Sequence, residues 1–250
     1  MARRSSILTI IGRAFSASAK NFHITLAAAA MYGISLAVID HIIFSMVGVS
    51  SPPAQQDLPK VLVSMLGAQF GVEIFLGPIL AACAVYVGRT AAEGTSGSLY
   101  KAVNFALSRY TRVFIPHFVA WLSITLGMVI IVPGVLFLLQ YAFVDAVACM
   151  EEEKSPLPRS KRLTKGRRKS LFLLALPWIA LSQLLGFFQL WALSQSGLVM
   201  AAGDTVASMI TFVMFVAFYL LYDERTRKKR SKTKASTKTT PETPISTSMA

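Results

Sequence analysis

The chain has 250 residues, of which 54% are apolar and only 15% are charged, and its formal net charge is +13. With a mean hydropathy of +0.56, this composition excludes an ordinary soluble globular domain and favours a membrane protein. The excess of positive charge would suit nucleic acid or anionic lipid as a partner, and the positions of the basic residues along the chain distinguish the two.

The first predicted element is an amphipathic helix within residues 1–23. Its apolar face is formed by Ile7, Ile11, Ala14 and Phe15. The basic residues Arg13 and Lys20 lie off this face, which is typical of a helix in the membrane interface. A packed cytoplasmic helix is the alternative. The apolar run is shorter than the core of a secretory signal peptide, so we expect no cleavage.

The next elements are membrane spans, because long apolar runs fill most of the chain between residues 24 and 222. The run from Val113 to Met150 is too long for one span: its 38 residues would make a helix of roughly 57 Å, against a hydrocarbon core of about 30 Å. Pro133 and Gly134 predict a hairpin tip within it. The sequence therefore predicts an all-α polytopic protein with three hairpins and six transmembrane helices: 24–49, 61–88, 113–132, 135–150, 171–193 and 206–222.

The distribution of Lys and Arg tests this topology, because these residues accumulate in short cytoplasmic loops. With six spans, 24 of the 25 basic residues fall on one side and only Lys60 falls on the other. We therefore expect both termini in the cytoplasm. Amphipathic helices at the cytoplasmic interface are expected before the first, third and fifth spans.

The loop 154–170, KSPLPRSKRLTKGRRKS, carries eight Lys or Arg between the fourth and fifth spans. This position favours a topology signal that lies against anionic headgroups of membrane lipids, and the aromatic residues and motifs of a nucleic-acid-binding surface are missing. The polar, basic segment 223–250 is expected to be a disordered cytoplasmic tail that could bind a protein partner.

Ionisable residues inside the spans are candidates for function, since they are costly in a membrane. Asp40, His41 and Glu73 lie at similar predicted depth and would form a proton or cation site. His117 and Asp145 form a second candidate pair nearer the cytoplasm. The alternative for both groups is hydrogen bonding between helices, or a position at the interface.

No motif for a catalytic centre, a cofactor or a metal is present in the sequence, so we expect no enzyme activity, cofactor or metal site. Cys83 and Cys149 are expected to be small apolar fillers. Gly67 and Gly71 form a GxxxG pattern that would allow two helices to approach closely.

One segment, VPGVLFLLQYAFVDAVACMEEEKSPLPRSKRLTKGRRKSLF, resembles the most recognisable part of bacterial YciC-like membrane proteins, which are related to the membrane domain of some glycerophosphoryl diester phosphodiesterases. The matching positions are Pro133, Gly134, Glu151, Arg159, Ser160, Leu163, Lys165 and Gly166. The resemblance runs from about Gly77 to Leu193, and Pro158 departs from it where a helix-forming residue would be usual. It implies a six-span protein of the bacterial cytoplasmic (inner) membrane, without the phosphodiesterase catalytic domain.

Two functions remain open at this point. The first is a non-enzymatic membrane protein that organises lipids or partner proteins through its basic cytoplasmic face. The second is a small transporter or permease subunit that uses Asp40, His41 and Glu73. An intramembrane enzyme acting on lipid and a nucleic-acid-binding protein are weaker hypotheses.

Overall fold

The computed structural model describes residues 6–46, 58–151, 155–192 and 197–237. The described part of the chain is α-helical and contains no strand. Its helices, in chain order, are α1 (Ile7–Lys20), α2 (Phe22–Met46), α3 (Leu58–Glu93), α4 (Leu99–Met128), α5 (Val132–Tyr141), α6 (Val144–Met150), α7 (Pro156–Thr164), α8 (Arg168–Ala192) and α9 (Gly197–Thr237). The all-α prediction is confirmed for these residues.

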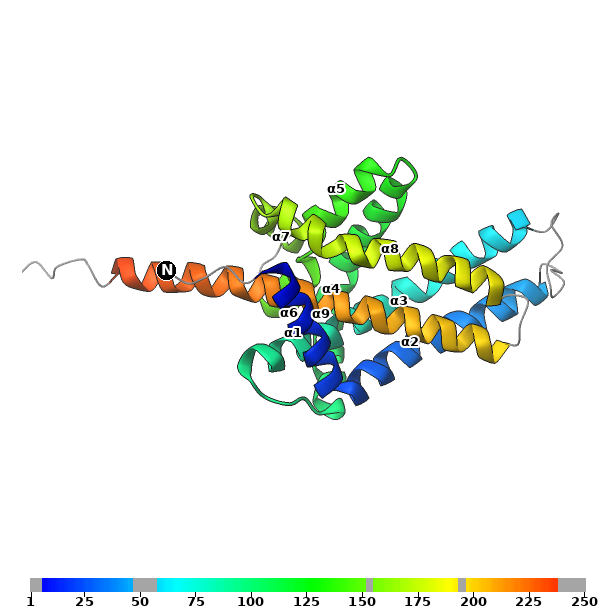
Figure 1. The fold of residues 1–250 in the computed structure, drawn as a ribbon, viewed down its shortest axis with the longest axis horizontal. Coiled ribbons are helices and arrows are strands. Elements are labelled where there is room, and N and C mark those ends of the chain that lie inside the picture. Colours follow the sequence, from blue (N-terminus) through cyan, green and yellow to red (C-terminus); the bar gives the residue numbers. More distant parts are fainter. Residues whose placement is uncertain (1–5, 47–57, 152–154, 193–196, 238–250) are drawn as a thin grey trace, which may run out of the picture.

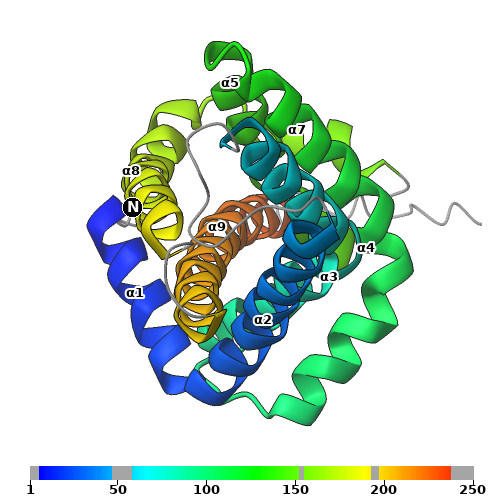
Figure 2. The same ribbon diagram turned by 90° about the vertical axis from the view of Figure 1, so that its right-hand side faces the viewer.

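Helix α9 lies at the centre of the bundle and packs against α1, α2, α3 and α8 (Figure 2). The ends of α2 and α8 and the beginnings of α3 and α9 lie at the right in Figure 1, whereas α1, α6 and α7 lie nearer the opposite end. We call the right-hand end of Figure 1 the loop end and the opposite end the α6–α7 end.

Four described segments are long and apolar enough to cross a membrane. They are Phe22–Met46, Gly67–Glu93, Val132–Met150 and Leu198–Thr226. The helix α4 is not among them, since its first half carries Lys101, Arg109 and Arg112 and its apolar part begins only at Val113. An all-helical membrane protein is therefore supported, and the finer prediction of six spans is taken up below as a proposal.

The predicted break inside residues 113–150 is a turn between α4 and α5. Ile131 has a positive φ of 61°, which is unusual for a β-branched residue, and Pro133 follows in the first turn of α5. A Cβ atom on Gly134 would lie 2.5 Å from the backbone nitrogen of Met128. Only glycine therefore allows α5 to return this closely against α4. A second break, at Ala142 and Phe143, separates α5 from α6.

Glycine also brings the central helices together, although not at the predicted GxxxG. A Cβ on Gly33 of α2 would lie 2.5 Å from the backbone nitrogen of Thr205 in α9. A Cβ on Gly67 or on Gly71 would meet nothing within 4 Å. The close helix contact is therefore between α2 and α9.

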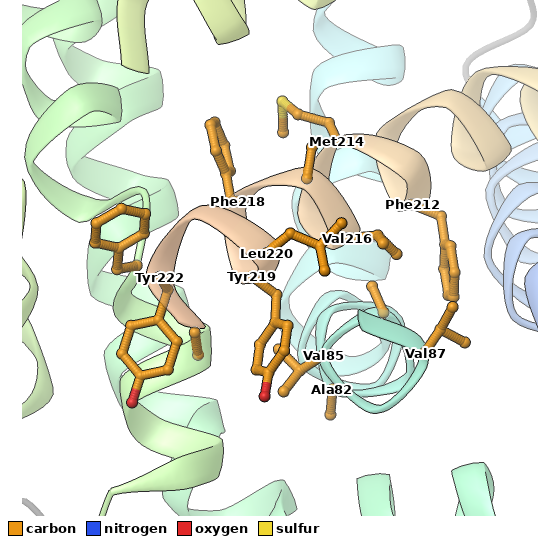
Figure 3. Close-up of a cluster of buried hydrophobic side chains, with 14 of the residues drawn as sticks. Ala82, Val85, Val87, Phe212, Met214, Val216, Phe218, Tyr219, Leu220 and Tyr222 are labelled. Carbon is orange, nitrogen blue, oxygen red and sulfur yellow. The ribbon is translucent and has the colours of Figure 1, made fainter. Parts of the chain in front are cut away.

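The buried core lies between α3 and α9 and continues into α1, α4 and α6. Figure 3 shows Phe212 and Tyr219 of α9 directed toward the turns of α3 that carry Val85 and Val87, whereas Met214 and Phe218 point to the other side of α9. The largest buried side chains of α9 are Phe212, Phe218, Tyr219 and Tyr222. The core thus combines small residues on α3 with aromatic residues on α9, which permits close packing of the two helices.

The first helix, α1, buries Ile10, Ala14 and Ala17 and exposes Leu8 and Phe15. It is capped by Ser6, whose hydroxyl accepts a hydrogen bond of 3.1 Å from the Thr9 amide. It packs against α9, and Leu8 and Phe15 remain free to contact a membrane surface. The structure thus shows the packed face of this helix, and its position in the membrane interface stays a prediction.

The last helix differs from the predicted tail, which was placed at 223–250. Helix α9 continues to Thr237, and residues 238–250 lie outside the described ones. Glu224 is largely buried, with 16% of its side chain exposed, and lies 3.8 Å from Arg13 of α1. The segment contains many Lys and Arg residues, which favour helix formation. In addition, Glu224 of this segment contacts α1.

Two of the positions that resemble the YciC-like motif, Glu151 and Arg159, are in contact at the junction of α6 and α7. Arg159 pairs with Glu151 at 2.8 Å, and the Tyr222 hydroxyl donates to the same carboxylate at 2.9 Å. We call Glu151, Arg159 and Tyr222 the junction network. Its residues join α7 and the end of α6 to α9.

The rest of the motif shapes α7. The buried Ser160 hydroxyl donates to the Gln140 carbonyl at 2.8 Å and accepts from the Phe143 amide at 3.2 Å, so it satisfies the break between α5 and α6. Leu163 is buried, Lys165 ends the helix, and Gly166 has a positive φ of 81°. Pro158 falls in the first turn of α7, where proline is tolerated.

Candidate functional site

A row of hydrogen-bonded ionisable side chains crosses the interior of the bundle. His117 of α4 lies between two carboxylates: its Nε2 is 3.0 Å from Glu73 Oε1, and its Nδ1 is 2.9 Å from Asp145 Oδ1. We call Glu73, His117 and Asp145 the acid–histidine cluster. It joins three helices, α3, α4 and α6, that are far apart in the sequence.

Tyr32 of α2 completes this row, because its hydroxyl donates a hydrogen bond to Glu73 Oε2. The side chains of the cluster are well shielded: 5% of His117 is exposed, and 13% of each carboxylate residue. Burial strengthens each contact and makes an unpaired charge costly. These residues therefore form a coupled unit.

A glycine allows the cluster to form. Gly77 lies one turn after Glu73 on α3, and a Cβ there would lie 2.8 Å from both Glu73 Oε1 and His117 Nε2. Any side chain at this position would push the two hydrogen-bonded atoms apart. On the other side of the His117 imidazole ring, Asp145 lies in the first turn of α6, which begins after the break at Ala142 and Phe143.

The cluster lies in the wall of a cavity of about 880 Å³. Most of the lining is apolar, with Trp121, Ile124, Leu138, Trp178, Phe215 and Phe218 among its residues. Among the described residues, the ionisable groups that line the cavity are Tyr32, Glu73, His117, Tyr141, Asp145 and Asp204. An apolar cavity with a few convergent polar groups is the usual form of a small-molecule site.

The charges in this wall do not balance. Within the acid–histidine cluster, Glu73 and Asp145 contribute −2 if ionised, and a protonated His117 contributes +1, which leaves −1. A net charge of this size is costly in a low-dielectric interior. The cavity therefore requires either protons on its carboxyl groups or a bound cation.

The geometry of the cluster disfavours metal binding and nucleophilic catalysis. The two carboxylates lie on opposite nitrogens of one imidazole, so they do not surround a single point at which a metal ion could bind. Among the described residues no group of three His, Cys, Asp or Glu side chains is placed to hold a metal. Both imidazole nitrogens are already engaged, which leaves none to activate a nucleophile as in hydrolytic triads.

The two groups of residues predicted from the sequence are divided differently by the structure. Glu73 contacts His117 and Tyr32, and no described contact joins it to Asp40 or His41. Asp40 is buried at 2% exposure and interacts electrostatically with Asp204. His41 is exposed on the outer side of α2. The pair His117 and Asp145 is brought together, with Glu73 as its third member.

Three contributors were missed by sequence reasoning: Tyr32, Gly77 and Asp204. Asp204 lies just before the predicted span 206–222 and was therefore not counted as an intramembrane acid. Tyr32 lies within the first predicted span, where a buried hydroxyl usually needs a partner, and this was a usable signal. Gly77 carries no local signal that distinguishes it from other glycines.

Comparisons with known proteins add no assignment. A scan against models of protein families finds no match, and searches of curated proteins and of solved structures also find none.

Proposed function

We propose that this protein is a multi-pass membrane protein that carries a small amphipathic amine and exchanges it for protons at the acid–histidine cluster. The observation that carries the proposal is the negatively charged cluster in the wall of a large apolar cavity. An ammonium group would supply the missing positive charge, and the aromatic and aliphatic lining would hold an alkyl or aryl group.

The six-span topology is part of this proposal. It adds α4 and α8 to the four apolar segments, with the loops 47–57 and 193–196 on the outer side and both termini in the cytoplasm. Large apolar side chains exposed along the helices support contact with lipid, among them Ile34, Val38, Phe75, Ile115, Leu126 and Leu173. A bacterial cytoplasmic membrane and a relation to YciC-like proteins are proposed with it, supported by the junction network at the motif residues.

The exchange follows from the hydrogen bonds of the cluster. A protonated imidazole donates to both carboxylates, whereas a neutral imidazole donates to only one and leaves the other to carry a proton. An ammonium ion that donates to one of these carboxylates, Glu73, takes the place of such a proton. Binding of the amine and release of protons are then two sides of one reaction, which is the basis of coupled carriers.

The test is a fluorescence titration of the purified full chain in detergent with an alkylamine that carries a dansyl group. We expect saturable binding, and for Glu73→Gln an affinity lower by roughly tenfold or more, because a hydrogen bond to a charged group is lost. Glu93→Gln is the matched control, since Glu93 lies on the same helix and is exposed. Equal binding by the wild type and Glu73→Gln would refute the proposed site.

A second candidate function is organisation of anionic lipids by the basic face. It is favoured by α7, which buries Ser160, Leu163 and Thr164 and thereby leaves basic side chains exposed. These are Lys161, Lys165, Arg168 and Lys169, the last two at the start of α8. Reversing all four charges should abolish preferential retention of anionic lipids during purification. Unchanged retention would exclude this function.

A further inference from the structure

Two buried acids outside the acid–histidine cluster lie toward the loop end of the bundle. Asp40 precedes the end of α2 at Met46 by less than two turns, and Asp204 follows the start of α9 at Gly197 by about two turns. Each residue is only 2% exposed. Asp40 Oδ1 has no hydrogen-bond partner within the described part of the chain. A buried carboxyl group of this kind in a membrane bundle is a candidate for proton transfer.

The packing of α2 against α9 connects these acids to the cluster. Gly33 is so close to α9 that a Cβ on it would lie 2.7 Å from the Asp204 carbonyl carbon. Its neighbour Tyr32 is therefore at the level of Asp204, and both residues line the same cavity. The Tyr32 hydroxyl is hydrogen-bonded to Glu73.

These residues form one series. Asp40 lies about two turns beyond Gly33 on α2, the helix that packs against the part of α9 carrying Asp204. Asp204 shares the cavity with Tyr32, Tyr32 donates to Glu73, Glu73 contacts His117, and His117 contacts Asp145. The series runs from the loop end toward the α6–α7 end, where α6 begins (Figure 1). Each group in the series can both accept and donate a proton.

We propose that Asp40 and Asp204 form the entry half of a proton path that leads through Tyr32 to the acid–histidine cluster. This inference rests on the proposed proton-coupled function and adds the route by which protons from the loop end reach the site.

Each step transfers one proton and changes no oxidation state. A proton arriving on Asp40 passes to Asp204, and from there to the Tyr32 oxygen while the Tyr32 hydroxyl proton moves to Glu73. Glu73 protonates His117 at Nε2, and His117 releases its Nδ1 proton to Asp145. One proton enters at Asp40, and one is left on Asp145, from which it is released toward the α6–α7 end. The interval between Asp204 and Tyr32 adjoins the cavity, where these two polar groups can hold a bridging water, and the transfer from Asp40 to Asp204 requires a bridging water as well.

Among the described residues, the titratable groups of this path and of the cavity come from six helices. They are Tyr32 and Asp40 on α2, Glu73 on α3, His117 on α4, Tyr141 on α5, Asp145 on α6, and Asp204 on α9. Within the described side chains of α8 no titratable group lines the cavity, although Trp178 and Ile179 do. The basic residue of the junction network, Arg159, pairs with Glu151.

The experiment uses the full chain in proteoliposomes that enclose a pH-sensitive dye. An inside-negative potassium diffusion potential drives proton uptake, measured with and without the dansyl alkylamine inside. For Asp204→Asn we expect uptake to fall at least about tenfold, while the equilibrium affinity for the amine in detergent changes less than about threefold. Asp204→Glu should restore most of the uptake, and Glu93→Gln should match the wild type.

The unchanged amine affinity of Asp204→Asn shows that the variant is folded, so a loss of uptake is not a loss of structure. Asp40→Asn provides an independent second variant and should also lose uptake. Wild-type uptake in both variants would overturn the path while leaving the amine site standing. A wild type that binds the amine and moves no protons would overturn the path as well.

Failure of the proposed function would give different results in the binding and uptake measurements. If the wild type binds no amine but takes up protons, and Asp204→Asn does not, the path is supported and the amine is not the substrate. If the wild type neither binds the amine nor takes up protons, both proposals are refuted.

Discussion

Two carboxylates at the ends of one short helix differ in how their charge is neutralised. Asp145, at the start of α6, faces His117, whose charge can change, in a wall that also holds Glu73. Glu151, immediately after α6, is paired with Arg159, which stays protonated, and accepts from Tyr222. The junction network therefore holds the helices together. The acid–histidine cluster, in the function that we propose, exchanges protons for an amine.

The largest effect that sharpens this contrast is expected for Glu73→Gln. The amide keeps the shape and an acceptor for Tyr32 but removes the charge, so amine affinity should fall roughly ten- to hundredfold. The thermal midpoint in detergent should change little. Binding is measured by dansyl fluorescence and stability by circular dichroism. A variant that loses stability but keeps affinity would make the cluster structural.

The reverse pattern is expected for Glu151→Gln. This change removes the partner of Arg159 and weakens the hydrogen bond from Tyr222, at a site with 18% of the Glu151 side chain exposed. We expect a loss of about 1–2 kcal/mol in stability, reduced from the buried value because the pair is partly solvated. Amine affinity should stay within about threefold of the wild type. A large loss of affinity would abolish the distinction between the two carboxylates.

A smaller effect on the acid–histidine cluster is expected for Gly77→Ala. The added Cβ would lie 2.8 Å from both Glu73 Oε1 and His117 Nε2 and would force their hydrogen bond to lengthen. Because both contacts are with side chains that can move, we expect affinity to fall only about three- to tenfold. Gly71→Ala is the matched control on the same helix, since its Cβ would meet nothing within 4 Å. Equal affinities of the two variants would contradict the role of Gly77.

A smaller effect on the junction network is expected for Tyr222→Phe. This change removes one donor to Glu151, over 2.9 Å, and leaves the ring packed against Phe143. We expect a loss of about 1 kcal/mol in stability and no change in amine affinity. An unaltered thermal midpoint would remove Tyr222 from the junction network.

Local patterns predicted most of the fold. The long apolar runs coincide with helices, so the helical segments could be located from residues close in the sequence. Pro133 and Gly134 placed the α4–α5 turn within a few residues of its position at 129–131. The tail differs because its contact with α1, through Glu224 and Arg13, joins distant segments.

The candidate site was predictable only in part. Glu73, His117 and Asp145 were each singled out as ionisable groups in apolar runs, but they were divided between two sites. The division assumed parallel helices, with depth counted from the end of each span. Figure 2 shows α4 extended along one side of the molecule while α2 and α9 are viewed nearly end-on. This crossing brings His117 to Glu73 and is fixed by packing of distant segments.

The exchange of protons for an amine is tested most directly by isothermal titration calorimetry of the wild type and Glu73→Gln. The dansyl alkylamine is titrated in two buffers with different ionisation enthalpies, so that the difference in heat counts the protons released. We predict net proton release by the wild type, and a smaller release together with weaker binding by Glu73→Gln. Amine binding with the same heat in both buffers would mean that no protons are exchanged and would contradict the central claim.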